Sequence, residues 1–369
     1  MIKTIGVIGG GQLARMMIPA AAKLGIELKV LAETEDSSAK LAATMVGDYT
    51  DLETVRAFAK TVDVITFDHE HVPLSIIETL ESEEVSFQPS SKALKFAQNK
   101  LEMRKRLAEL GLPMPDWAEV NNAVDVQDFL DSHSGVAILK TPTGGYDGKG
   151  VLVINSVDDA RPWLSQGSPL LIEEKVNFVR ELAQLSARNA SGQWKSWPVV
   201  QTIQRDGVCS EVLSPAPDAD QIQSAMIAKR IAEGLQVTGN LAVEMFETDS
   251  GQLLINELAM RPHNSGHFSI EGSVTSQFEQ HLRAVADLAL GDTSASKPFA
   301  VMVNLLGVDD SNTFVEHYTS ALEDAGVHFH SYGKSARPGR KMGHITVLAD
   351  ESLEHAREIA LEAKRSLHA

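Results

Sequence analysis

Cysteine is almost absent from this sequence, which contains only Cys209 among its 369 residues. A lone cysteine cannot form an internal disulfide and is typical of a reducing compartment, where we expect Cys209 to be a small buried side chain. Long apolar runs are also lacking, since no stretch approaches the ~18 residues that a membrane-spanning helix needs. Lys3 stands directly before a short apolar strand and not before a signal-peptide core. The sequence therefore predicts a cytoplasmic protein with no membrane segment.

Positive charge is in short supply as well. The chain has 33 Lys and Arg residues against 50 Asp and Glu residues, which gives a formal net charge of −17. Proteins that bind nucleic acid neutralise its phosphates with clustered cations, so this balance argues against a nucleic-acid surface. Any phosphate-binding site must depend on a few local Lys and Arg residues.

The remaining composition describes an ordinary globular protein. Hydrophobic residues make up 43% of the chain and charged residues 22%, both close to the average for such proteins. The length allows about two or three domains, each large enough to bury its own core.

The chain opens with the pattern of a parallel βαβ unit. Apolar residues 5–8 precede Gly9-Gly10-Gly11-Gln12, a helical pattern follows to about Leu24, and a second strand spans 27–32 with Glu33 at its end. The glycines and Glu33 satisfy a dinucleotide fingerprint. Any tight strand-to-helix turn selects glycine for steric reasons, however, so a phosphate-bearing substrate is preferred to NAD at this helix N-terminus.

A third predicted strand, residues 63–67, runs into a polar segment, Asp68-His69-Glu70-His71. Ligands bind at the carboxyl ends of parallel strands, so Glu70 is expected to face the same crevice as Gln12. We interpret His69 and His71 as solvated loop residues. A long helix rich in Lys and Arg is predicted over 92–110, ended by Gly111.

A glycine-rich loop separates the predicted strands 136–140 and 151–154. Lys140 leads into it, and four of the seven residues from Gly144 to Gly150 are glycine. Such a backbone can close over phosphates. It is not a P-loop, because no helix follows and no Ser or Thr succeeds the lysine. A plain flexible hairpin is the alternative to a phosphate-covering lid.

The segment from Leu253 to His267 concentrates most of the chemistry. Strands predicted over 241–246 and 253–255, joined by a turn, would form an antiparallel hairpin that brings Glu244 near Glu257. Two carboxylates beside the Asn256 amide can hold Mg²⁺ that bridges phosphate oxygens, although solvated acids at a hairpin end would have the same pattern. The cation and imidazoles that follow, Arg261, His263 and His267, favour a functional site.

Together these motifs resemble the ATP-grasp superfamily and, within it, the N5-carboxyaminoimidazole ribonucleotide synthetases. The resemblance covers nearly the whole chain and includes the opening Gly-Gly-Gly-Gln-Leu, the Gly144 to Gly150 lid, the Asn256-Glu257 pair, the Arg261 to His267 segment and a basic motif, 337–344. It implies ATP and Mg²⁺, with Mn²⁺ as an alternative metal, and neither biotin nor NAD. It also implies a homodimer whose substrates are ATP, bicarbonate and the aminoimidazole ribonucleotide.

The resemblance also assigns residues. It implies that ATP is contacted by Lys100, Lys140, Gly145, Tyr146, Asp147, Gly148, Lys149, Gly150, Glu173, Glu174, Lys175, Val176, Glu181, Gln204, Asn256 and Glu257. Gln204 stands where the family usually has histidine, and Asn99 where it usually has aspartate. The implied metal ligands are Glu244 and Glu257. The implied contacts of the aminoimidazole ribonucleotide are Gln12, Glu70, Tyr146, Asp147, Lys149, Arg261, His263, Asn264, Lys334, Arg340 and Lys341.

The implied reaction is carboxylation of the exocyclic amine of 5-aminoimidazole ribonucleotide through carboxyphosphate, giving ADP and phosphate. We expect Lys140 to offset phosphate charge, Arg261 to stabilise carboxyphosphate, and Asp147 to take the proton of the amine. Two alternatives remain. One is another ATP-grasp ligase, such as a formate-dependent ribonucleotide transformylase, and the other is a non-catalytic nucleotide- or NAD-binding protein.

The predicted fold is mixed α/β and α+β in three parts. Residues 1–98 would form a doubly wound, Rossmann-like domain that precedes the ATP-grasp domain. Residues 99–291 would form the ATP-grasp domain with antiparallel sheets, and residues 292–369 a small α+β domain.

Overall fold

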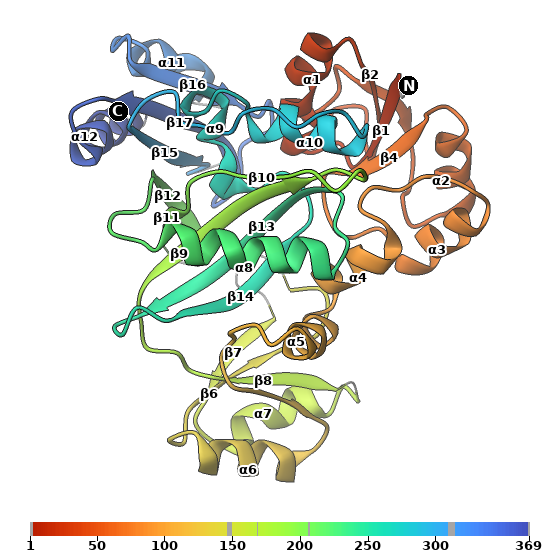
Figure 1. Ribbon diagram of the computed structural model, residues 1–369, viewed down its shortest axis with the longest axis vertical. Coiled ribbons are helices and arrows are strands. Elements are labelled where there is room, and N and C mark those ends of the chain that lie inside the picture. The colour runs from red at the N-terminus through yellow and green to blue at the C-terminus, as the bar shows by residue number, and fades with distance from the viewer. Residues whose placement is uncertain (1–2, 146–149, 168, 206, 309–313, 368–369) are drawn as a thin grey trace.

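The computed structural model describes residues 3–145, 150–167, 169–205, 207–308 and 314–367. Three regions follow one another along the chain, and Figure 1 shows the N-terminal region and the C-terminal region on either side of the central one. The central region extends downward into a smaller lobe that contains β5 to β8. The three-part architecture expected from the sequence is therefore confirmed, whereas the exact boundaries remain predictions.

The N-terminal region is a parallel sheet with strand order β3-β2-β1-β4. Its first strand pairs with β2 on one side and β4 on the other, so the carboxyl ends of β1 and β4 lie side by side. The elements are β1 (Thr4–Ile8), α1 (Gln12–Leu24), β2 (Glu27–Ala32), β3 (Ala43–Val46), α2 (Leu52–Ala59), β4 (Val64–Phe67) and α3 (Leu74–Ser82).

The single helix predicted over residues 92–110 is wrong. The chain forms α4 (Ser91–Gln98) and α5 (Lys100–Glu109), separated at Asn99, whose backbone is extended with φ −129° and ψ 110°. The Asn99 side chain accepts hydrogen bonds from the N–H groups of Leu101 and Glu102 at 3.0 and 3.2 Å. Asparagine is a favoured N-cap residue because it satisfies such donors, and this local preference outweighs the helical pattern.

The lower lobe is a four-stranded antiparallel sheet with order β5-β8-β6-β7. The predicted hairpin around the glycine-rich loop is present, since β6 and β7 pair from Ala137–Ile154 to Lys140–Val151. The lobe contains β5 (Trp117–Val120), α6 (Ala123–Ser132), β6 (Ala137–Lys140), β7 (Val151–Ile154), α7 (Val157–Leu164) and β8 (Leu170–Glu174).

The rest of the chain is organised on one large antiparallel sheet, with order β14-β13-β9-β11-β12-β15-β17-β16 and β10 beside β9. Strands of the C-terminal region continue this sheet, because β15 pairs with β12. Its strands are β9 (Phe178–Arg188), β10 (Trp194–Ser196), β11 (Val200–Arg205), β12 (Val208–Ser214), β13 (Gly239–Thr248), β14 (Leu253–Ala259), β15 (Phe299–Leu306), β16 (Val327–Ser331) and β17 (Lys341–Ala349). Its helices are α8 (Gln221–Gly234), α9 (Ser269–Gly272), α10 (Gln277–Val285), α11 (Phe314–Ala321) and α12 (Leu353–Ser366).

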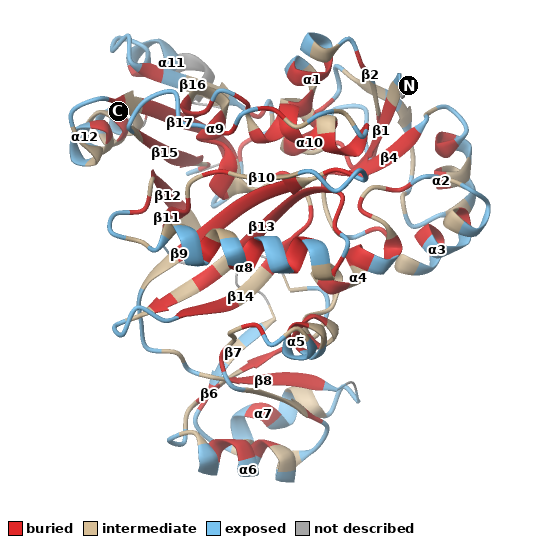
Figure 2. Cartoon of the chain, viewed as in Figure 1, coloured by how far each residue is buried: buried red, intermediate tan, exposed pale blue. Residues whose placement is uncertain are grey.

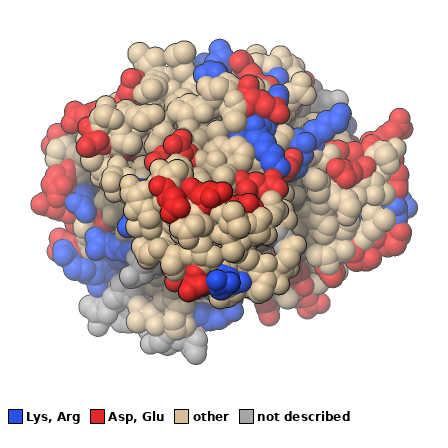
Figure 3. Space-filling model, turned by 90° about the horizontal axis from the view of Figure 1, so that it is seen from below, with Lys and Arg blue, Asp and Glu red and all other residues tan. Residues whose placement is uncertain are grey.

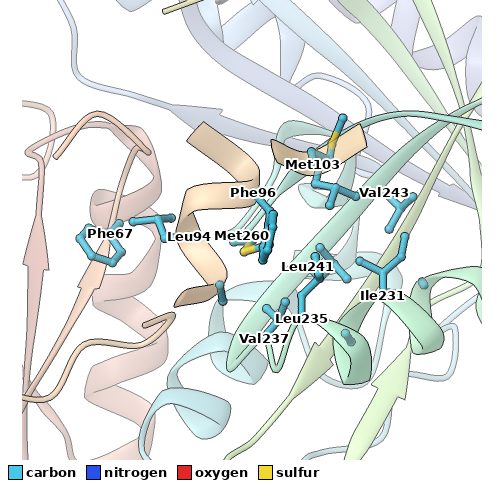
Figure 4. Close-up of a cluster of buried hydrophobic side chains, with 14 of the residues drawn as sticks. Phe67, Leu94, Phe96, Met103, Ile231, Leu235, Val237, Leu241, Val243 and Met260 are labelled. Carbon is cyan, nitrogen blue, oxygen red and sulfur yellow. The ribbon is translucent and has the colours of Figure 1, made fainter. Parts of the chain in front are cut away.

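One hydrophobic cluster joins the N-terminal region to the central one. Figure 4 shows Phe67 and Leu94 beside Phe96 and Met260, and these in turn near residues of β13 and α8. Figure 2 shows the strands β9 and β13 buried along most of their length, whereas α8 is exposed on its outer face. Helix α4 is therefore the element through which the two regions share a core.

The surface agrees with the acidic composition. On the face seen in Figure 3, Lys and Arg side chains lie in separate small groups among acidic and uncharged ones. Within the described residues, no helix is both long and apolar enough to cross a membrane.

Candidate functional site

A cavity of about 830 Å³ lies where β4, β8, β9, β13 and β14 meet. Residues from the N-terminal, central and C-terminal regions line it together, as the sequence motifs require. The predicted site residues in its wall are Gln12, Glu70, Lys100, Lys140, Gly145, Glu173, Glu174, Lys175, Val176, Glu181, Gln204, Glu244, Asn256, Glu257, Arg261, His263, Asn264 and Lys341.

A closed ring of polar contacts joins the lower lobe to β14. Lys140 Nζ lies 2.6 Å from Glu173 Oε2 and donates to Asn256 Oδ1 at 3.1 Å. Arg104 Nε lies 2.5 Å from Glu173 Oε1, and its other nitrogens donate to the carbonyls of Ile255 and Asn256, each at 2.9 Å. Burial raises the pKa of Glu173, but the neighbouring Arg104 and Lys140 outweigh it and hold that pKa below its usual value. The ring fixes Lys140 at the cavity edge as an ion pair.

Glu173 lines the cavity, and its carboxylate also has a structural role, whereas its predicted contact with ATP remains a prediction. Its side chain is only 2% exposed and is held between Arg104 and Lys140, so the carboxylate orients the lysine. Arg104 was missed because charged residues on a helix usually form a solvated face, and no spacing signal marks the one that is fully buried.

The predicted pair of carboxylates is present. Strands β13 and β14 are antiparallel neighbours in which Glu244 stands directly opposite Glu257. Burial and the charge of Glu257 raise the pKa of Glu244 to about 7. Lys100 Nζ lies 2.9 Å from Glu257 Oε1, so one of the two acids already has a cation beside it.

An aromatic pair, Phe178 and Phe246, forms part of the cavity wall between the lower lobe and the large sheet. Their rings are stacked, with centroids 4.7 Å apart and planes 16° from parallel. Glu181 lies on the same strand as Phe178, and burial raises its pKa while a hydrogen bond from Gln204 opposes that rise. Stacked rings beside a half-buried acid can accept a nucleobase and its ribose hydroxyls.

The segment after β14 forms the other side of the cavity. Glu70 binds it twice, since Oε2 lies 2.6 Å from Arg261 Nε and Oε1 accepts from the Met260 N–H at 3.1 Å. His263 Nε2 lies 3.3 Å from Glu244 Oε1, and burial lowers the pKa of His263 to about 3. His263 is therefore neutral. Arg261 and Glu70 were each predicted to contact the ribonucleotide, and the ion pair between them is a feature that the sequence did not predict.

The Asn264 amide is oriented by a second amide, Asn304 on β15. Asn264 Nδ2 donates to Asn304 Oδ1 at 3.0 Å, and Asn304 Nδ2 donates to Asn264 Oδ1 at 2.7 Å. Asn304 is fully buried and also donates to the Cys209 carbonyl. The C-terminal region thus contributes to the site through an asparagine that no sequence motif indicated. Cys209, expected to be buried, is only partly so and lines the cavity.

Protein carboxylates accept hydrogen bonds from one N–H group of the glycine turn and from one N–H group in the first turn of α1. Glu33 Oε2 accepts from the Gly10 N–H at 3.0 Å, and Asp68 Oδ1 accepts from the Ala14 N–H at 2.7 Å. A Cβ atom at Gly11 would lie 2.0 Å from Asp68 Oδ2. Glycine is therefore needed at position 11 for the close approach of Asp68. A substrate phosphate would have to share the N–H groups of Gly10 and Ala14 with these two carboxylates.

His69 is not the solvated residue that we expected. Its Nε2 lies 3.3 Å from Glu33 Oε1, and its Nδ1 accepts from the His71 N–H at 3.2 Å. His71 is exposed as expected, although both histidines line the cavity. Because both ring nitrogens of His69 are engaged, His69 supports the glycine turn.

The basic residues of the C-terminal region differ in how close they lie to the cavity. Lys341 lines the cavity, and Lys334 donates to the Gln12 side chain, which also lines it. Arg340 Nη1 donates to the Ser335 carbonyl at 3.0 Å and is not among the described lining residues. Gly150 is not among the described lining residues. Its carbonyl accepts a hydrogen bond from the Thr141 N–H at 3.0 Å, at the base of the loop. Tyr146, Asp147, Gly148 and Lys149 lie outside the described residues.

Three family models match successive parts of the chain. The ribonucleotide synthetase preATP-grasp domain matches residues 2–98, the ATP-grasp domain residues 105–278, and the phosphoribosylaminoimidazole carboxylase C-terminal domain residues 300–358.

Similar proteins agree with these matches. The N5-carboxyaminoimidazole ribonucleotide synthase of Mycobacterium tuberculosis H37Rv is 45% identical over 361 residues, which is 94% of this chain and 84% of that protein. Two crystal structures of the Aspergillus clavatus enzyme, one complexed with ATP and one with ADP and 5-aminoimidazole ribonucleotide, superpose with a TM-score of 0.89 at 32% identity. Each comparison covers 99% of this chain and 98% of the other.

Proposed function

The chain belongs to the N5-carboxyaminoimidazole ribonucleotide synthase family of ATP-grasp ligases, and from this premise we propose how its cavity performs the family's reaction. The enzyme carboxylates 5-aminoimidazole ribonucleotide at the expense of ATP in purine biosynthesis. One observation carries the proposal. Strand β14 carries Asn256 and Glu257, and Asn256 lies beside Lys140. The chain then continues directly to Arg261, which lies beside Glu70, and to His263. All of these residues line the same cavity.

We propose that ATP occupies the side of the cavity formed by the lower lobe and the large sheet. The stacked Phe178 and Phe246 would cover the base, and Glu181 would accept hydrogen bonds from the ribose. Lys140 and Lys100 would approach the phosphates, since both amines line the cavity, one beside Asn256 and the other beside Glu257. Preorganised cations of this kind lower the barrier to phosphoryl transfer without reorganising during the reaction.

Glu244 and Glu257, beside Asn256, fit a magnesium ion. The two carboxylates face each other across neighbouring strands, and their mutual repulsion contributes to the raised pKa of Glu244. A divalent cation would relieve that repulsion through the oxygen ligands it prefers. Within the described part of the chain, no three His, Cys, Asp or Glu side chains form a metal-binding group, so further ligands would come from phosphate and water. When bound, the ion would withdraw charge from the phosphate oxygens.

On the acceptor side, we propose that Arg261, His263 and Asn264 bind the aminoimidazole ribonucleotide together with Glu70 and Gln12. Lys334, Lys341 and Arg340 would serve its phosphate, although Arg340 would first have to leave Ser335. The guanidinium of Arg261 is held by Glu70 at the junction of the two sides. It can therefore stabilise an anionic intermediate formed between them.

The proposed chemistry has two steps. An oxygen of bicarbonate attacks the γ-phosphorus of ATP, ADP leaves, and carboxyphosphate forms. Carboxyphosphate then breaks into phosphate and CO₂, and the exocyclic amine captures the CO₂ and loses a proton. Asp147 remains our prediction for the proton acceptor. We further propose that the enzyme is a cytoplasmic homodimer, which sedimentation equilibrium tests.

An assay of ADP formation tests this proposal. ADP release is measured with ATP alone, with bicarbonate, with the ribonucleotide, and with both. Only the complete mixture should give full turnover, whereas formate-dependent turnover would favour a transformylase. Asp147→Asn should abolish coupled turnover, and Arg261→Ala should abolish bicarbonate-dependent ATP hydrolysis. Normal activity in either variant would remove that residue from the chemistry.

A further inference from the structure

Gln277, the first residue of α10, is fully buried behind the acceptor side of the cavity. Its side chain does not line the cavity. Uncharged amides are rarely buried without partners, because each unpaired donor or acceptor in the interior costs about 1–3 kcal/mol. The contacts of Gln277 therefore show what it holds in place.

The Gln277 amide binds the backbone of His263 in both directions. Its Oε1 accepts from the His263 N–H at 2.8 Å, and its Nε2 donates to the His263 carbonyl at 2.8 Å. This is the pairing that a neighbouring β-strand would provide, supplied by one side chain. It fixes the position and direction of His263 at the point where the chain has left β14.

The same amide also determines the state of His267. Gln277 Nε2 lies 2.9 Å from His267 Nδ1. Because Oε1 is committed to the His263 N–H, Nε2 must be the donor, so Nδ1 of His267 accepts and its proton lies on Nε2. Burial lowers the pKa of His267 well below its usual value, which keeps the ring neutral. His267 is thus a packing partner of the segment.

The Gln277 side chain packs closely against the backbone of Gly266. A Cβ atom at Gly266 would lie 2.4 Å from Gln277 Oε1 and 2.2 Å from Leu185 Cδ2. The backbone of Gln277 is anchored as well, since its N–H donates to Ser269 Oγ at 2.8 Å and its carbonyl accepts from Asn240 Nδ2 at 2.9 Å. The backbone of Gln277 is thus fixed at the start of α10, and its side-chain amide links His263 to that fixed point.

We propose that Gln277 is a positioning residue for the carboxylation reaction, and that it sets the affinity for the aminoimidazole ribonucleotide by holding the Arg261–Asn264 segment. The inference rests on the proposed function of that segment. Small displacements of binding groups are costly, and a misplacement of about 1 Å can reduce a rate by about 100-fold. Loss of the Gln277 amide would leave the His263 N–H without its acceptor and would remove one of two donors to the His263 carbonyl, the other being the Gly266 N–H. The amide itself makes no described contact with the ATP side.

The chain contains a matched control three residues along the same helix. Gln280 is also fully buried, and its amide makes the same two-way contact with the backbone of Gly291, at 2.7 and 3.0 Å. Gly291 lies outside the cavity wall. Replacing Gln280 therefore removes an equivalent buried clamp without touching the acceptor side.

The experiment compares Gln277→Met with Gln280→Met by steady-state kinetics in the full-length enzyme. Gln277→Met should raise the KM for the aminoimidazole ribonucleotide by on the order of tenfold or more, with the KM for ATP unchanged. Gln280→Met should lower the melting temperature to a similar extent and leave both KM values unchanged. Gln277→Glu keeps the acceptor for the His263 N–H, so a smaller rise in the same KM is expected, and it decides the question if the Met variant does not fold.

Several results would overturn the inference. A wild-type KM for the ribonucleotide in the Gln277 variants would do so, as would equal changes in both KM values or the same change in Gln280→Met. His263→Ala separates the two proposals. If His263→Ala raises the KM for the ribonucleotide and the Gln277 variants do not, only the role of Gln277 is wrong. If His263→Ala has no effect, the proposed acceptor site itself is wrong.

Discussion

Arg104 has no exposed surface, and all of its described contacts are to Glu173 and the β14 backbone. Removing one member of a buried ion pair is costly because the partner charge stays buried without compensation. We therefore expect Arg104→Met to reduce the free energy of unfolding by about 3–5 kcal/mol, measured by urea titration. Arg106→Met, on the same helix, should cost much less because the Arg106 salt bridge to Glu109 is exposed. Equal costs for the two variants would refute the structural role of Arg104.

Lys334 gives the acceptor side a pH dependence. Burial, reinforced by Arg340 and Lys341 and opposed by Asp68, lowers the pKa of Lys334 to about 8. The amine is charged below that pH and neutral above it, so affinity for a phosphate should fall as pH rises through about 8. The kcat/KM for the ribonucleotide should then decline by about tenfold per pH unit, since kcat/KM reports groups of the free enzyme.

Lys334→Arg is the control for that profile. A guanidinium stays charged throughout the accessible pH range, so the alkaline decline should disappear even if the affinity is lower. A decline that persists unchanged in Lys334→Arg would assign it to another group.

The sequence predicted the residues of the proposed site better than the buried residues that hold them in position. Glu244 and Glu257 were expected to lie near each other because two strands joined by a turn would form a hairpin, and the structure places them directly opposite each other. Their side chains carry a signal because paired acids beside an amide suit one kind of ligand. Arg104, Gln277 and Asn304 carry no such signal, since their roles come from burial against distant segments.

Among the helices, the break between α4 and α5 depends on one side chain. Asn99 caps α5, and the next residue, Lys100, lies beside Glu257 in the cavity. We expect Asn99→Ala to lower the free energy of unfolding by about 1 kcal/mol and Asn99→Asp to preserve it, because aspartate is an equally good N-cap. Chemical denaturation measures both, and an Asn99→Ala variant as stable as Asn99→Asp would contradict the capping role.

Element types were predictable where the hydrophobic period was clear, as in residues 27–32 and 151–154, which match β2 and β7. The single helix over 92–110 was wrong because its two halves have compatible hydrophobic patterns, and the preference of Asn99 for an N-cap position outweighs them. Periodicity reports which side of an element is buried but not where two collinear elements separate.

For the molecule as a whole, the shared core predicts that the N-terminal and central regions unfold together. All four tryptophans, Trp117, Trp163, Trp194 and Trp197, lie outside residues 1–98. Leu94→Ala opens the cluster joining the regions and should cost about 2–5 kcal/mol. The tryptophan fluorescence transition should shift by that amount, whereas regions that unfold separately would leave it unchanged.

The three-part architecture was accessible from the sequence because motifs of known order run along almost the whole chain. The continuity of the large sheet from β14 to β16 was not, since sheet order depends on pairings such as β12 with β15 that connect residues far apart in sequence. The predicted boundaries at residues 98 and 291 remain predictions.

We propose that one cavity couples ATP cleavage to carboxylation through carboxyphosphate. Turnover with ¹⁸O-labelled bicarbonate, ATP and the aminoimidazole ribonucleotide, followed by mass spectrometry of the phosphate, tests it most directly. Attack by a bicarbonate oxygen on the γ-phosphorus leaves one bicarbonate oxygen in each phosphate released, so each phosphate should contain a single ¹⁸O. Phosphate that contains no label, formed at the rate of carboxylation, would contradict it.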